Sequence, residues 1–126
     1  MDPIPTNAGP PAWLSEIAAW VAAADGDNQP SSAQYVETTR RAAARIVSGS
    51  WVDSDQDVYL VMLRGNFVHN RHPYGVPPPR GTVATFTADR ITQGIYDFSL
   101  GDRVPDLSAL GQIHDLPLPE APELRP

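Results

Sequence analysis

The chain has 126 residues, a formal net charge of −6 and no cysteine. This length is typical of one domain that buries a core without disulfides or metals, and the missing cysteines exclude disulfides, thiolate metal ligands and cysteine nucleophiles. The acidic balance argues against a nucleic-acid binder, because such proteins need a basic surface.

The first residues divide into a proline-rich stretch and an amphipathic helix. Residues 1–11 hold four prolines and little to bury, which predicts a flexible arm. From residue 12 onward, apolar side chains recur at helical spacing. The apolar face consists of Trp13, Leu14, Ile17, Trp20, Val21 and Ala24. Gly26 and Pro30 then end the helix.

The same helix bears on location. A cleavable export signal needs basic residues before an uninterrupted apolar run, whereas here Asp2 precedes the run and Glu16 interrupts it. No apolar stretch reaches the roughly 18 residues of a transmembrane helix. We therefore expect a cytoplasmic protein that does not contact membranes.

A second helix is predicted over residues 31–48. Ser31 and Gln34 have the spacing of a capping box, and Gly49 is a natural helix stop. The buried stripe is expected to hold Tyr35, Val36, Thr39, Ala42, Ala43, Ile46 and Val47. The arginines of this segment are expected to lie in solvent and to pair with neighbouring acids.

Three aspartates at alternate positions follow: Asp53, Asp55 and Asp57. A calcium loop of the EF-hand type would need Gly at its sixth position and Glu at its twelfth, where this chain has Val58 and Arg64. The aspartates are therefore interpreted as the polar start of a strand. The sequence VYLVMLRGNFV that follows is apolar on both faces, which is typical of a central strand.

Two further strands are predicted over residues 81–89 and 94–100, where the side chains alternate. In the first, we expect Phe86 to be buried beneath the second helix. In the other, the inward side chains are expected to be Tyr96, Phe98 and Leu100, and the outward ones Ile95, Asp97 and Ser99.

The predicted fold class is α+β: two N-terminal helices followed by a three-stranded antiparallel meander, with a helix packed across one sheet face. Residues 12–111 are expected to form this single domain. The last residues, 112–126, hold several prolines and are expected to form a flexible tail.

The stretches VYLVMLRGNF, GTVATFTAD and IYDFSLG resemble the helix-plus-meander unit of PepSY-type domains, which are α+β domains of cystatin-like arrangement. The ending DFSLGDRVPDLSALG is similar to that of small actinobacterial proteins. In the family, the turn has an Asp, two residues and then Thr-Gly; here Gln93 separates Thr92 from Gly94, which predicts a longer or bulged turn. The resemblance covers residues 35–111 and implies a non-catalytic domain, since some members restrain proteases.

Motifs of catalysis and metal binding are absent from the sequence. His69 and His72 are three residues apart, but Pro73 disfavours the helix in which they could share a metal, and His114 has no further ligand at local spacing. The chain has neither a G-x-S-x-G elbow nor a glycine-rich phosphate loop. We expect no metal and no cofactor, while a pair of catalytic carboxylates stays open.

The long connection over residues 69–81 is the strongest functional feature of the sequence. It combines an aromatic residue with a stiff proline triplet, and long loops in compact domains often carry function. The predicted partner-binding residues are Tyr74, Pro77, Pro78, Pro79 and Arg80.

Three functions remain open. The first is a small non-enzymatic binding or regulatory module for a protein or peptide partner, or for a second copy, acting through this loop or an exposed sheet edge. The second is an enzyme or ligand binder with a pocket on the concave sheet face, lined by Tyr59, Arg64, His69 and Tyr96. The third is a structural or assembly subunit.

Overall fold

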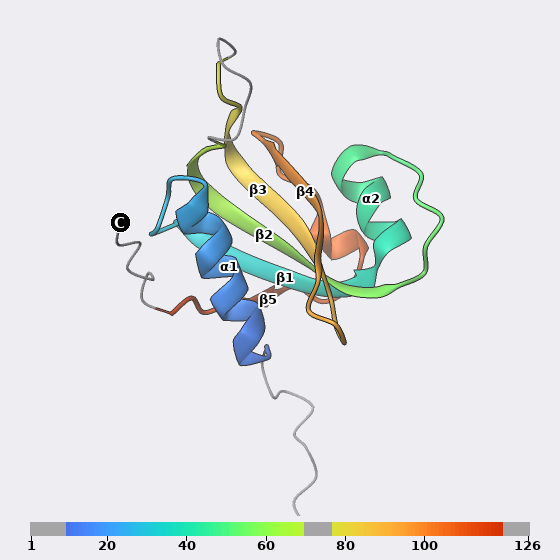
Figure 1. The fold of residues 1–126 in the computed structure, drawn as a ribbon. Coiled ribbons are helices and arrows are strands. Elements are labelled where there is room, and N and C mark those ends of the chain that lie inside the picture. Colours follow the sequence, from blue (N-terminus) through green and yellow to red (C-terminus); the bar gives the residue numbers. More distant parts are fainter. Residues whose placement is uncertain (1–9, 70–76, 120–126) are drawn as a thin grey trace, which may run out of the picture.

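The computed structural model describes residues 10–69 and 77–119. Its elements are α1 (Ala12–Ala24), β1 (Ser32–Thr39), α2 (Arg40–Ser48), β2 (Asp57–Val68), β3 (Arg80–Asp89), β4 (Ile95–Gly101), the 3-10 turn η1 (Leu107–Ala109) and β5 (His114–Asp115). The strands form one antiparallel sheet in the order β4-β3-β2-β1-β5. Figure 1 shows α1 crossing this sheet, whereas α2 lies away from α1, near one end of the strands.

The predicted three-stranded meander is wrong, although the class is still α+β. The sheet has five strands, because residues 32–39 form β1 instead of the first half of a helix and because His114–Asp115 add the short strand β5. β1 pairs with β2 along its whole length, from Ser32 opposite Arg64 to Thr39 opposite Asp57. Its β-branched and aromatic residues favour this pairing, and their apparent helical spacing was a coincidence.

The start of α2 also differs from the prediction, whereas its end agrees with it. Ser31 is not a helix cap, because its N–H and hydroxyl both donate to the Arg64 carbonyl, at 2.7 and 3.0 Å. The cap is Thr39, whose hydroxyl oxygen accepts from the Ala42 N–H at 3.3 Å. Gly49 ends α2 in the left-handed region, with φ of 72°, as predicted from its residue type.

One core lies between α1 and the sheet. The predicted helix is confirmed over Ala12–Ala24, but its inner face is centred on small residues: Leu14, Ala18 and Ala22 are buried there, whereas Trp20 points outward and is 56% exposed. Phe86 is fully buried in this core. It therefore packs beneath α1, and the predicted position beneath the second helix is wrong.

A second core lies on the opposite face of the sheet, beneath α2. Alternation along β2 divides the two cores, because Val61 and Leu63 face α1 while Leu60 and Met62 face α2. The α2 core also includes Val36, Ala43, Val83 and Leu107, with Val47 and Leu110 packed at its margin. Both faces of the central strands are thus covered by helices.

A bulge in β4 changes which side chains share a face. Thr85 pairs with Ser99 and Thr87 pairs with Tyr96, so two residues of β4 stand opposite Phe86. Asp97 lies in this bulge with a left-handed φ of 57°. Bulged residues break the alternation of a strand. The predicted inward set is correct for Leu100, which packs on the α1 core, and Phe98 lies on the same face. It is wrong for Tyr96, which shares the α2 face with Asp97, and the predicted outward residue Ile95 lies on the α1 face.

The segment after η1 returns to the sheet. β5 pairs with β1, with His114 opposite Tyr35, and the two rings stack at 5.1 Å. Leu116 is buried in the α1 core. These residues belong to the segment that is predicted to form a flexible tail. Within the part of that segment that the structure describes, they instead pack on the domain.

Candidate functional site

Strand β4 forms one edge of the described sheet and pairs with β3 alone. Its outer side therefore presents backbone N–H and C=O groups that no described strand takes up. The strand can lie close to β3 because Gly81 has no side chain: a Cβ there would come within 2.5 Å of the Gly101 carbonyl oxygen. The edge is flanked by a hollow on each face of the sheet.

The first hollow, here called the α1-side cavity, lies between the C-terminal half of α1 and β4. It has a volume of about 300 Å³ and is lined by Trp20, Val21, Ala24, Asp25, His69, Ile95 and Phe98. Three of its apolar side chains reach solvent, since Trp20, Ile95 and Phe98 are 56%, 44% and 38% exposed. Exposed apolar side chains gathered around one hollow are typical of interaction sites.

The polar groups of the α1-side cavity form one pair. Asp25 follows the last residue of α1 and is 7% exposed, and its carboxylate lies 2.9 Å from Nδ1 of His69. The backbone holds both residues in place, because the Val68 N–H donates to the Asp25 carbonyl at 2.8 Å. The His69 ring also packs on Phe98, with ring centres 5.5 Å apart.

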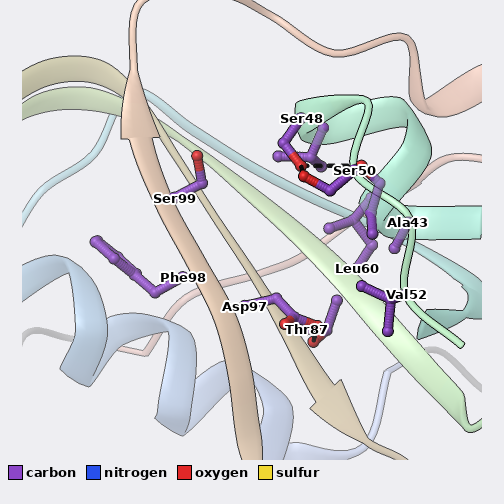
Figure 2. A pocket seen from close by; sticks show the side chains of 11 residues that line it. Ala43, Ser48, Ser50, Val52, Leu60, Thr87, Asp97, Phe98 and Ser99 are labelled. Atoms are coloured by element: carbon purple, nitrogen blue, oxygen red, sulfur yellow. Dashed lines mark hydrogen bonds between the residues drawn. The ribbon is translucent and has the colours of Figure 1, made fainter. Parts of the chain in front are cut away.

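The second hollow, the α2-side cavity, lies between α2, the loop after it and β4 (Figure 2). Its volume is also about 300 Å³, at the lower limit of small-molecule sites. It is lined by Ala43, Ala44, Val47, Ser48, Ser50, Val52, Leu60, Thr87, Asp97, Phe98 and Ser99. Figure 2 shows the Phe98 side chain turned away from α2, so that this residue contributes to both hollows from the strand between them.

Asp97 anchors the strand side of the α2-side cavity. Its carboxylate accepts two hydrogen bonds from the Arg40 guanidinium, at 2.8 and 3.0 Å, and one from the Thr87 hydroxyl at 3.1 Å. The Arg40 guanidinium also lies 4.9 Å from the centre of the Tyr96 ring. Hydrogen bonding from Arg40, and to a smaller extent from Thr87, lowers the pKa of the Asp97 carboxyl. The charge of Asp97 is thus balanced by Arg40, and this carboxylate has a structural role.

Hydroxyl groups line the helix side of the α2-side cavity. Ser48 donates to the Ala44 carbonyl at 3.1 Å, and its oxygen lies 2.8 Å from the Ser50 oxygen (Figure 2). Beside the cavity, the buried Thr85 hydroxyl has no hydrogen-bond partner among the described residues. The walls of this hollow are therefore partly polar.

The four residues predicted to line a pocket do not meet in one place. Tyr59 lies on the α1 face, against Trp13 and Tyr35, and burial raises its pKa. Tyr96 lies on the α2 face with Arg40, and Arg64 is exposed far along β2. Of the four, His69 alone lines the α1-side cavity.

The predicted partner-binding loop is described only in part. Tyr74 lies outside the described residues. Pro77, Pro79 and Arg80 are exposed, Pro78 is half-buried, and the Pro79 carbonyl accepts from the His69 N–H at 2.9 Å. This bond joins the loop to the α1-side cavity, and a role of the loop in partner binding stays a prediction.

The three aspartates before β2 have arginine partners. Arg41 lies 2.9 Å from both Asp53 and Asp55, and Arg90 lies 3.4 Å from Asp57, at the first residue of the strand. Asp57 is the first residue of β2, as the interpretation of a polar strand start predicts, whereas Asp53 and Asp55 lie in the loop before the strand. Within residues 10–69 and 77–119, no group of three His, Asp or Glu side chains is arranged to hold a metal ion.

Sequence reasoning missed most of the site. The sequence places the exposed Trp20 on the buried face of its helix, and its pattern does not single out Asp25. The available signal was the run of alanines in α1, because small residues allow a helix to pack closely and leave a tryptophan outside. The bulge at Asp97 could not be predicted, because the side chains around Asp97 alternate as they do in a regular strand.

Comparisons with known proteins give no relative. No protein-family model matches the chain, and no curated protein and no solved structure is significantly similar to it. The resemblance to PepSY-type domains therefore stays a prediction. Among the described residues, no helix is long and apolar enough to span a membrane.

Proposed function

We propose that the protein is a non-enzymatic binding module that takes up an extended segment of a partner protein at the edge of β4. The observation that carries this proposal is the pair of hollows on opposite faces of β4, which pairs with β3 alone among the described strands. A segment that pairs with such an edge gains affinity from backbone hydrogen bonds.

The two hollows fit the geometry of an added strand. Successive side chains of a strand point to opposite faces of a sheet. A segment beside β4 would therefore direct alternate side chains toward the α1-side cavity and the α2-side cavity. Pockets for alternate side chains supply the specificity in this mode of recognition.

The polar groups of the α2-side cavity support binding rather than catalysis. In the part of the chain that the structure describes, no serine hydroxyl is hydrogen-bonded to a histidine, and Asp97 is occupied by Arg40 and Thr87. A nucleophile needs an adjacent base, and a general acid or base needs a proton that it can exchange with substrate. The resemblance to PepSY-type domains, which act without catalysis, agrees with this proposal.

Selection from a library tests the proposal without a known partner. Random linear peptides displayed on phage are selected on the immobilised full-length chain, and the selected peptides are then titrated by fluorescence polarisation. We expect Trp20→Ala to weaken binding by about tenfold or more, because aromatic anchors dominate such contacts.

The chain offers a matched control for this substitution. Trp51 is 70% exposed and lies in the loop after α2, outside the α1-side cavity. Trp51→Ala should leave the affinity unchanged. A library that yields no binder, or a selected peptide that Trp51→Ala weakens as much as Trp20→Ala does, would refute binding at β4.

A further inference from the structure

We propose that the α1-side cavity selects partners with a basic residue: it takes the side chain of one arginine or lysine from the extended segment. This inference rests on the proposed function, because the added strand at β4 brings the side chain to the cavity. It names the chemistry of the partner, an extended segment in which apolar residues surround a cation.

The walls of the cavity fit the stem of a long basic side chain. Trp20, Ile95 and Phe98 supply exposed apolar surface around the hollow. Arginine and lysine lay their methylene groups along such surface while the charged group stays at the polar end.

The base of the cavity supplies the matching charge. Asp25 is 7% exposed, and among the described residues its one ion-pair partner is His69. An imidazole neutralises a carboxylate fully only when it is protonated. A buried carboxylate is costly without a full counter-charge, so a cation that enters the cavity would improve the environment of Asp25.

The overall charge favours a basic segment over a second copy of this chain. Each copy has a net charge of −6, so two copies repel one another as they approach. The same charge attracts a cationic partner and raises its association rate. Asp97 and Arg40 on the other face are already paired, and the α2-side cavity therefore adds no such preference.

The peptides selected on the full-length chain test this inference through their composition. We expect enrichment of one arginine or lysine between apolar residues. Replacing that residue by norleucine in a synthetic peptide should weaken binding by about tenfold. With Asp25→Asn the same replacement should change affinity by less than about twofold, because the charge that selects the cation is gone.

A measurement on the unmodified chain tests the inference even if Asp25→Asn does not fold. Raising the salt concentration should reduce the preference for the basic peptide over its norleucine form, because salt screens the attraction between the cation and the acidic chain as the two approach. A preference that neither salt nor Asp25→Asn reduces would overturn the inference.

The remaining outcomes separate the inference from the proposed function. Selected peptides without a basic residue, still sensitive to Trp20→Ala, would overturn the inference and leave strand addition standing. A library without binders would overturn both. Dimerisation of the chain that blocks peptide binding would overturn the inference by placing a second copy at the edge.

Discussion

Arg40, the first residue of α2, holds Asp97 in the bulge of edge strand β4 through two parallel hydrogen bonds of 2.8 and 3.0 Å. The two residues lie 57 positions apart in the sequence. Their pairing fixes the distance between α2 and β4, and so sets one wall of the α2-side cavity. A planar guanidinium matches both oxygens of a carboxylate, which an ammonium group does not.

We predict that Asp97→Asn destabilises the fold by about 0.5–1 kcal/mol, measured by urea unfolding. The value is modest because both side chains are 29% exposed, and exposed ion pairs contribute little. Asn also tolerates the left-handed backbone at this position, so the change isolates the charge. Asp53→Asn, at a pair in which Asp53 is 85% exposed, should cost less; a larger effect there would contradict the structural role of Asp97.

The acid sensitivity of the β3–β4 turn should depend on Asp89. Its carboxylate accepts from the backbone N–H groups of Thr92 and Ile91, at 2.6 and 2.7 Å, and from Gln56. The bond from the Thr92 N–H, followed by those from Gln56 and Ile91, lowers the pKa of Asp89 from 3.8 to about 2. The native state therefore favours the ionised carboxylate more than the unfolded state does.

It follows that Asp89 stabilises the fold fully above its unfolded pKa of 3.8, and that this contribution is lost as the pH falls from 3.8 to about 2. Unfolding curves measured across this window should show stability decreasing toward low pH. In Asp89→Asn the decrease should be smaller, since the titrating group is removed. An unchanged acid limb in the variant would show that other carboxylates determine it.

The close contact of β3 with β4 predicts unequal effects of substitutions at two neighbouring glycines, Gly81 and Gly101. In Gly81→Ala the new Cβ would lie 2.5 Å from the Gly101 carbonyl oxygen, so the backbone of one strand must move. We expect a loss of about 1–3 kcal/mol in the free energy of unfolding. Gly101→Ala is the control, because nothing lies within 4 Å of a Cβ there. Equal effects of the two substitutions in thermal unfolding would contradict the observed pairing.

Two phenylalanines should differ sharply in their contribution to stability. Phe86→Ala should cost about 3–5 kcal/mol, because Phe86 is fully buried beneath α1. Phe98→Ala should cost less than about 1 kcal/mol, because that ring is 38% exposed at the α1-side cavity. If Phe98→Ala proved as destabilising as Phe86→Ala, the cavity wall would belong to the core and the edge would not be available to a partner.

Local patterns predicted much of the fold. The helix over residues 12–24, the stop at Gly49 and the strands near residues 58–68, 81–89 and 95–100 follow from periodicity and turn residues. Gln93 lies in the turn between β3 and β4, in the left-handed region at φ of 65°. These features depend on neighbouring residues, which a sequence displays directly.

Features that depend on distant residues were not predictable. Residues 32–39 have apolar side chains at a spacing that fits a helix, and pairing with β2 makes them a strand. The bulge at Asp97 is stabilised by Arg40 and Thr87, which lie on other elements. The two cavities arise only when α1, α2 and β4 are brought together. Tertiary contacts override local preference in each case.

The most direct test of the central claim is backbone amide hydrogen exchange of the full-length chain with and without a peptide selected on it. If the peptide adds a strand, exchange should slow in residues 95–101, because their outward N–H groups gain hydrogen bonds. Exchange in β5 (His114–Asp115), at the opposite edge of the sheet, should stay unchanged. Slower exchange in β5 together with unaltered exchange in β4 would contradict strand addition at the β4 edge.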